Sequence, residues 1–241
     1  MSDTTLIDYS KHAGAGMENI TSDDLQIPFL QIVQTNSAEV DKGHADYPTK
    51  HIEGVESGDI IDTVSRTIVA KFDQPLNVIP TGYYKAYVEW RSRDQGGGIV
   101  QVHKDPNIIS QCTKNDNFKD VLDNGNEIVT TAYFTVLYEN DGNWEKAIVS
   151  MSASQLKKAK MWLSKITSIK LTSPEGNKYQ APIFSHKYSL TSITQSNNKG
   201  SWFGWKVDLV GAVEEDHLVE EAVALSGSEV VPQLTTEENP F

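Results

Sequence analysis

Residues 128–138 read IVTTAYFTVLY; Asn140-Asp141-Gly142 comes next, and residues 144–151 then read WEKAIVSM. β-Branched and aromatic residues dominate the first segment, which is the composition of a β-strand. Asn-Asp-Gly is a tight-turn signal, so the two segments predict a β-hairpin. This is the strongest strand signal in the chain, and the other elements are placed around it.

Further strands are expected on both sides of this hairpin, at residues 27–34, 60–69, 76–90 (two strands, or one long strand bent at Pro80 and Gly82), 183–191 and 202–210. One amphipathic helix is predicted from Ser152, which forms a capping box with Gln155, and its apolar face consists of Leu156, Ala159, Leu163 and Ile166. Short helices are expected near 117–122 and at 216–225, and Gly96 to Gly98 predict a mobile loop. The pattern favours a mainly β fold with one prominent helix, an OB-fold-like β-barrel. A β-sandwich would give the same alternation and stays open.

Charge divides the chain, whose net charge is −12, into three parts. Residues 1–141 carry 11 basic and 22 acidic side chains, residues 142–212 carry ten lysines and three acids, and residues 213–241 carry eight acids without lysine or arginine. We therefore predict a flexible acidic arm at 1–26, a β-rich nucleic-acid-binding body at 27–212 and a disordered acidic tail at 213–241.

The basic segment also holds four of the five tryptophans: Trp144, Trp162, Trp202 and Trp205. Unpaired bases stack on aromatic rings and phosphates attract cations, so lysines among aromatics are typical of single-strand binders. Period-two alternation puts Tyr84, Ala86, Val88 and Trp90 in the core, together with Phe203, Trp205, Val207 and Leu209 of a later strand. The predicted nucleic-acid-binding residues are Tyr83, Lys85, Tyr87, Arg91, Arg93, Lys157, Lys158, Lys160, Trp202 and Lys206.

The last five residues, Glu237-Glu238-Asn239-Pro240-Phe241, resemble the tip of bacterial single-stranded-DNA-binding proteins, whose acidic tails close with Pro-Phe. They are also similar to phage-encoded counterparts. The resemblance implies an OB-fold body and a tail that recruits replication, recombination or repair enzymes through Glu237, Glu238, Pro240 and Phe241. We therefore expect a phage protein that binds single-stranded DNA without sequence preference, and whose tail competes with DNA for the basic surface.

Two other functions are kept beside this one. A phage structural or scaffolding protein without nucleic-acid affinity would have a similar β-rich body with charged ends, and a nuclease would depend on Glu89. Nucleotide-binding glycine motifs and zinc-protease motifs are absent, the six histidines are scattered and Cys112 is the single cysteine, so we expect no enzyme, metal or cofactor.

The sequence also predicts where the protein works. There is no signal-peptide pattern and no apolar run of membrane length, and a single cysteine fits a reducing compartment. We expect the cytoplasm of a bacterial host and no membrane contact. DNA against RNA and the oligomeric state, a homo-oligomer included, stay open.

Overall fold

The computed structural model describes residues 10–12, 15–19, 25–198 and 200–226. The strands are β1 (Phe29–Ile32), β2 (Ile60–Asp62), β3 (Ile68–Ala70), β4 (Leu76–Trp90), β5 (Ile99–His103), β6 (Thr113–Lys114), β7 (Asp120–Val121), β8 (Glu127–Asn140), β9 (Asn143–Ser152), β10 (Lys170–Thr172), β11 (Lys178–Gln180), β12 (His186–Asn197) and β13 (Gly200–Ala212). The α-helices are α1 (Tyr47–Lys50), α2 (Leu156–Ser168) and α3 (Asp216–Leu225). The 3-10 helices are η1 (Ser10–His12), η3 (Arg93–Gln95), η4 (Pro106–Gln111), η5 (Ala153–Gln155) and η6 (Ile183–Ser185).

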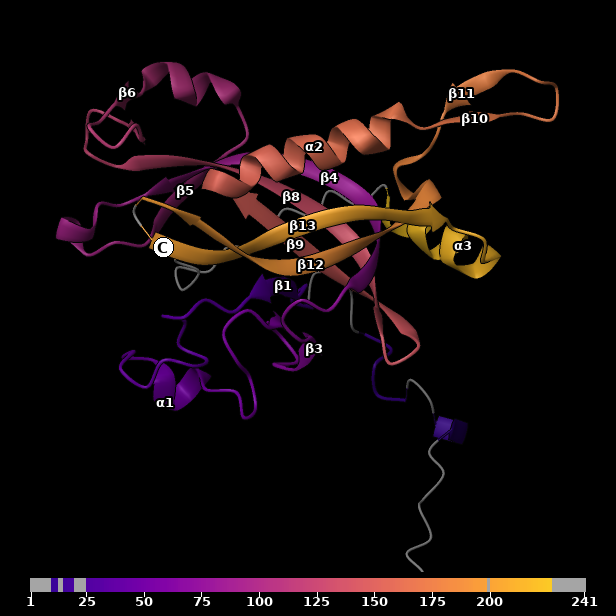
Figure 1. Cartoon of the computed structure of the whole chain (residues 1–241), viewed down its shortest axis with the longest axis horizontal. Helices are drawn as coiled ribbons and strands as arrows, with labels where there is room; N and C mark the ends of the chain where they lie inside the picture. The colour runs from indigo at the N-terminus through magenta and orange to yellow at the C-terminus, as the bar shows by residue number, and fades with distance from the viewer. Residues whose placement is uncertain (1–9, 13–14, 20–24, 199, 227–241) are drawn as a thin grey trace, which may run out of the picture.

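One curled sheet forms the body, with the strand order β13-β12-β4-β8-β9-β1-β2-β3 (Figure 1). It has the shape of a half-barrel, so the mainly β prediction is confirmed and the architecture agrees with an OB-fold-like core. The predicted β8–β9 hairpin is present and turns at Asp141 and Gly142, whose φ angles are +48° and +81°. β4 runs through the predicted bend, where its register against β8 shifts between Pro80 and Gly82.

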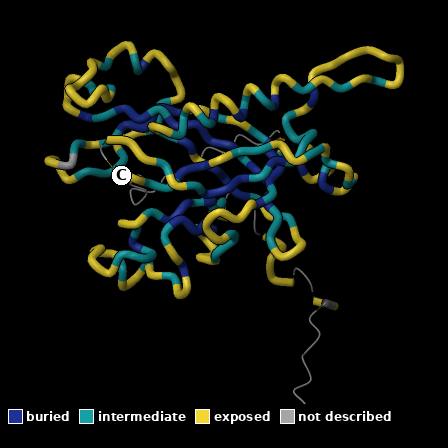
Figure 2. Tube along the Cα trace, viewed as in Figure 1, coloured by how far each residue is buried: buried dark blue, intermediate teal, exposed yellow. Residues whose placement is uncertain are grey.

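Helix α2 covers the central strands and completes the main core (Figure 1). Ala159, Trp162 and Ile166 are spaced three and four residues apart, so they fall on one face of the helix and are buried. Trp162 is fully buried and stacks on Phe134 of β8 with ring centroids 4.1 Å apart. The buried stretches follow the central strands along most of their length (Figure 2). Apolar burial by α2 therefore holds the long strands together.

The prediction that the tail is disordered from residue 213 is wrong up to residue 226. Helix α3 forms over the expected residues, but it packs on the body: Leu218 and Ala222 are buried against Ile79 of β4 and Leu137 of β8. Lys187 and Glu215 add an ion pair of 2.7 Å at its start. An acidic composition concealed this packing, because only the spacing of Leu218 and Ala222 gives the helix an apolar side. Residues 227–241 lie outside the described residues, as does most of the predicted arm at 1–26.

Three local predictions are also wrong. Residues 60–69 form two strands rather than one, because the Asp62 carboxylate accepts hydrogen bonds from the backbone N–H groups of Val64 and Ser65 and turns the chain. Residues 117–122 lie in the β6–β7 hairpin instead of a helix. The side chain of Ser152 makes no capping hydrogen bond. The Gln155 side chain is used for a contact with β13 instead.

Candidate functional site

A wide, open groove of about 1940 Å³ lies at one end of the half-barrel. Its lining comes from the tip of the β12–β13 hairpin, the β4–β5 turn, the residues before α2 and the segment around β1 and α1. Trp90, Trp202 and Phe203 line the groove and are half-buried, and the Phe203 ring also packs edge-on against Phe72 with ring centroids 5.4 Å apart. The groove thus brings together aromatic side chains from strands that are far apart in the sequence.

The remaining lining mixes apolar and polar side chains and carries only a small excess of positive charge. Amide and hydroxyl groups make up most of its polar part, among them Gln31, Gln34, Asn36, Ser150, Ser152, Gln155 and Asn197. Its ionisable residues are Lys50, Arg66 and Arg91, with His44, against Glu39 and Asp46. The Arg66 guanidinium donates to the His51 backbone oxygen at 3.1 Å, and this hydrogen bond fixes where the charged end of the side chain lies. Such a surface offers many hydrogen bonds and a modest attraction for anions.

The β12–β13 tip is held beside the groove by three glutamines: Gln34, Gln155 and Gln195. Together with residues 202–205 of β13 they form what we term the seam. The Gln34 side chain accepts from the Phe203 N–H at 2.9 Å and donates to the Phe203 oxygen at 3.0 Å. It therefore occupies the place that a neighbouring strand would take at the free edge of β13. Gln155 likewise accepts from the Trp205 N–H at 3.0 Å.

The same glutamines orient the Trp202 indole. Gln195 Oε1 accepts from Trp202 Nε1 at 3.1 Å and from Gln155 Nε2 at 2.9 Å. Gly204 lies under this pair, and a Cβ at that position would collide with the side chains of both Gln155 and Gln195. Glycine is thus required for the two amides to meet, and the Trp202 ring is held in place before any ligand arrives.

The predicted binding residues fall on separate surfaces. Arg91 and Trp202 line the groove. Tyr83 and Lys85 are exposed on the face of β4 that carries Phe134 of β8, and Lys157 and Lys160 are exposed on α2. The others are Lys158, which is half-buried; Lys206, which is exposed and pairs with Asp208 at 2.8 Å; and Arg93, whose side chain lies outside the described parts of the chain. The predicted partner-binding residues Glu237, Glu238, Pro240 and Phe241 also lie outside them.

Two aromatic assignments on β4 are wrong, in opposite directions. Tyr87 is only 4% exposed and packs against Ile108 and Ile128, so its ring is not presented to a base. Trp90, predicted to be in the core, lines the groove. Alternation shows correctly which residues of β4 share a face, but not how far each face is covered. Residues 104–126 fold over the face that carries Tyr87, and Trp90 on the other face is only partly covered. On β13, Trp205 is buried as predicted whereas Leu209 is 50% exposed.

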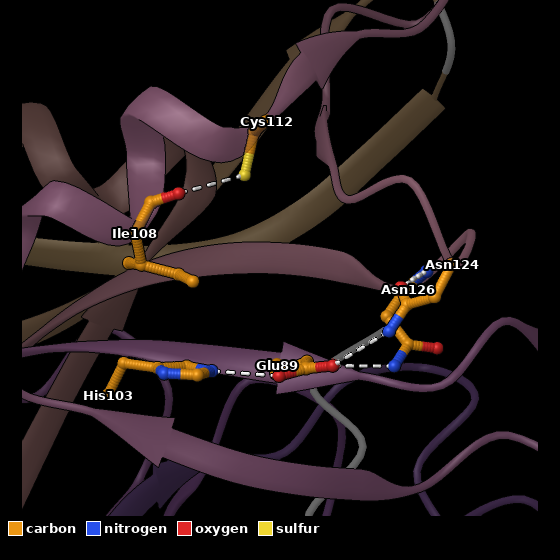
Figure 3. A network of polar contacts seen from close by, with 6 residues as sticks. All are labelled: Glu89, His103, Ile108, Cys112, Asn124 and Asn126. Atoms are coloured by element: carbon orange, nitrogen blue, oxygen red, sulfur yellow. Dashed lines mark hydrogen bonds and ion pairs between the residues drawn. The ribbon is translucent and has the colours of Figure 1, made fainter.

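Glu89, the carboxylate that a nuclease would need, is engaged in a buried network (Figure 3). Its Oε2 lies 2.8 Å from His103 Nε2 and its Oε1 accepts from Asn126 Nδ2 at 2.6 Å. Burial raises the pKa of Glu89, but the hydrogen bonds from Asn126, His103 and Asn124 outweigh it and the pKa is lowered. The network thereby links β4, β5 and the turn before β8.

No metal centre adjoins this network in the part of the chain that the structure describes, where no group of three histidine, cysteine or acidic side chains could hold an ion. Cys112 lies apart from Glu89 and its Sγ contacts the Ile108 oxygen at 3.5 Å (Figure 3). Burial raises the pKa of this thiol, which keeps it protonated and poorly nucleophilic.

A family model described as Pam3 phage gp34-like protein matches residues 2–230. The chain belongs to this phage family. Among curated proteins and among solved structures, nothing matches the chain. The family match covers the arm, the body and α3 of this phage protein, and it ends before the acidic Pro-Phe tip. None of the described helices is long and apolar enough to cross a membrane.

Sequence reasoning missed the residues that build the groove of this phage protein. Gln34, Gln155 and Gln195 are dispersed over the chain, and no local pattern marks them as neighbours. Lys50 and Arg66 come from the first part of the chain, whose net charge is negative. A charge summed over that part does not show where its individual cations lie. The predicted binding residues Arg91 and Trp202 do line the groove, and the Ser152–Gln155 motif also lies at this end of the molecule, although its predicted role is different.

Proposed function

We propose that this phage protein binds single-stranded DNA in the groove, without base preference, and protects it during phage replication or recombination. The observation that supports this most directly is the grouping of Trp90, Trp202 and Phe203 beside Arg91 in one open groove. Every base has a π-face, so stacking on such rings contributes about 1–3 kcal/mol per base whatever the sequence.

The groove's charge sets the expected salt dependence of this binding. Lys50, Arg66 and Arg91 provide three cations for phosphates. For single strands the logarithm of affinity falls with that of salt concentration with a slope of about −0.7 per phosphate contact, so the groove alone gives a slope of about −2. Stacking and amide hydrogen bonds then supply the larger share of the affinity.

The acidic chain end has a separate role in this proposal. The resemblance of Glu237, Glu238, Pro240 and Phe241 to the tips of single-strand-binding proteins supports recruitment of replication or recombination enzymes, and competition with DNA for the body. Because α3 is packed on the body, the segment available for these roles begins after Ser226.

The test is fluorescence anisotropy of a labelled, mixed-sequence oligonucleotide of about 12 nucleotides, within the range of known single-strand sites. Trp202→Ala is expected to weaken binding about 10-fold, since the loss of one stacking ring is worth about 1–3 kcal/mol. Arg91→Ala is expected to weaken it less and to reduce the salt slope by about 0.7.

Matched controls are available on other surfaces. Phe118→Ala removes an aromatic ring that is 84% exposed and outside the groove, and Lys114→Ala removes an exposed cation there. Neither is expected to change the affinity. Absence of binding by the unmodified protein, or equal affinity of Trp202→Ala, refutes the proposal. Oligomerisation without DNA affinity would instead support a structural or scaffolding protein.

A further inference from the structure

The outer face of α2 carries a line of polar and cationic side chains. Lys157, Lys160, Ser164 and Ser168 recur at intervals of three and four residues, so they lie along one side of the helix, and all are exposed. With Met161 and Lys165 they border a shallow depression of about 430 Å³. Lys165 is occupied there, since its Nζ donates to the Val207 oxygen at 2.8 Å.

The lysines of this line differ from other exposed lysines in their surroundings. Lys114, Lys119 and Lys206 each pair with a carboxylate at 2.7–2.8 Å. No carboxylate among the described residues lies within ion-pair distance of Lys157 or Lys160, and α2 itself contains no acid. Their charges are consequently not neutralised by the protein.

The β10–β11 hairpin continues this positive charge beyond α2, as an arm that projects from the body (Figure 1). Lys170 pairs with Gln180 and Thr172 with Lys178, and directly paired residues share a face of a two-stranded sheet. One face of the arm therefore carries Lys170 and Lys178, and the other carries Leu171 and Tyr179. The turn contributes one acid, Glu175.

We propose that Lys157, Lys160, Lys170 and Lys178 form a lysine track that holds the DNA strand where it leaves the groove. This inference rests on the proposed function. Ser154 and Gln155 line the groove immediately before α2, and the arm begins where α2 ends. The track is thus continuous with the groove, and α2 alone extends it by about 20 Å at 1.5 Å per residue.

Charge complementarity and continuity favour the same strand of DNA as the occupant. The groove supplies rings but few cations, whereas the track supplies cations with only Met161 as an exposed apolar side chain on α2. A short oligonucleotide held by its stacked bases occupies the groove only, and a longer one also brings its phosphates to the track. The proposal therefore predicts two binding regimes that are separated by length.

The experiment compares oligonucleotides of about 6 and about 20 nucleotides, the first near the lower end of the usual extent of a single-strand site and the second above it. The triple variant Lys157→Ala/Lys160→Ala/Lys178→Ala removes three track cations. Its affinity for the long oligonucleotide is expected to fall about 10-fold, and its salt slope to become less negative by about 2, with the short oligonucleotide unaffected. The control triple Lys104→Ala/Lys114→Ala/Lys119→Ala makes the same change in net charge away from the track and the groove and should alter neither.

Five outcomes are decisive. Loss for the long oligonucleotide alone supports the track. An equal loss at both lengths, no loss at either, or an equal effect of the control triple overturns it, while Trp202-dependent binding of the short oligonucleotide still supports the groove. Failure of the short oligonucleotide to bind the unmodified protein refutes the proposed function itself. All six lysines are exposed, so both triple variants are expected to fold normally. Circular dichroism checks this.

Discussion

The interior beneath α2 and the seam beside the groove both hold β13 to the rest of the protein, but by different forces. In the interior, Trp205 and Val207 join an apolar cluster with Trp162. At the seam, the backbone of Phe203 and Trp205 is bound by the amides of Gln34 and Gln155. An apolar core side chain is worth about 3–5 kcal/mol when it is as large as tryptophan, whereas one hydrogen bond contributes about 1 kcal/mol net. Apolar burial therefore determines whether the sheet curls, and the amides determine where the hairpin tip stands.

The largest effect should come from the interior. Trp162→Ala removes the fully buried ring that stacks on Phe134, and we expect the free energy of unfolding to fall by about 3–5 kcal/mol in urea titrations. Trp162→Phe keeps part of the packing and should lose less. A loss of less than about 1 kcal/mol for the alanine variant would contradict the view that the interior contributes more to stability than the hydrogen bonds of the seam.

Two truncations distinguish the packed part of the acidic end from the rest. Removing residues 213–241 takes away Leu218 and Ala222, which are buried against β4 and β8, and should cost about 2–5 kcal/mol of unfolding free energy. Removing only residues 227–241 should change it by less than about 0.5 kcal/mol. Thermal melts of both forms check this. Equal melting temperatures of the two forms would show that α3 does not stabilise the core. Only the shorter truncation, which keeps α3, is suited to test whether the tail competes with DNA.

The Glu89 network is a buried polar site. Its loss should therefore lower the free energy of unfolding by less than a substitution in the apolar interior and by more than one at the seam. Glu89→Gln is expected to cost about 1–3 kcal/mol at neutral pH, because its hydrogen bonds with His103 and Asn126 are charge-assisted. A lowered pKa in the folded state stabilises the protein above the ordinary glutamate pKa of 4.5, and this contribution is lost as pH falls through the lowered value.

Unfolding of wild type and Glu89→Gln is therefore compared across the acid range, with the exposed Glu53→Gln as the matched control. The difference between wild type and Glu89→Gln should be full at neutral pH and should narrow below pH 4.5. A difference that grows on acidification would contradict this role for the carboxylate.

The smallest stability effect, with the clearest effect on binding, is expected at the seam. Gln155→Ala removes the acceptor for the Trp205 N–H and the donor to Gln195, and should cost about 1 kcal/mol of unfolding free energy. Oligonucleotide affinity should fall as well, since the Trp202 ring is no longer held. Gln111→Ala, at an exposed glutamine of η4, should change neither quantity. Loss of stability without loss of affinity would show that Trp202 does not depend on the seam.

The sequence by itself determined the elements whose signals are local. The β8–β9 hairpin follows from a β-branched segment and a tight turn, the β4 bend from Pro80 and Gly82, and the buried side of α2 from its spacing. A short helix at 216–225 is also expected from the sequence, although the acidic surroundings predict that it would not pack on the body. Local signals suffice in these cases because backbone preference and periodicity depend on residues a few positions apart.

Only the tertiary structure decided which faces are covered and which side chains meet. Tyr87 is buried because residues 104–126 fold over its face of β4, whereas Trp90 lies on the other face of the strand and remains half-buried at the groove. Gln34 and Gln195 act together on β13 although 161 positions separate them in the chain. Burial and hydrogen bonding depend on elements distant in sequence, so no local pattern carries that information, and the groove exists only once the sheet has curled.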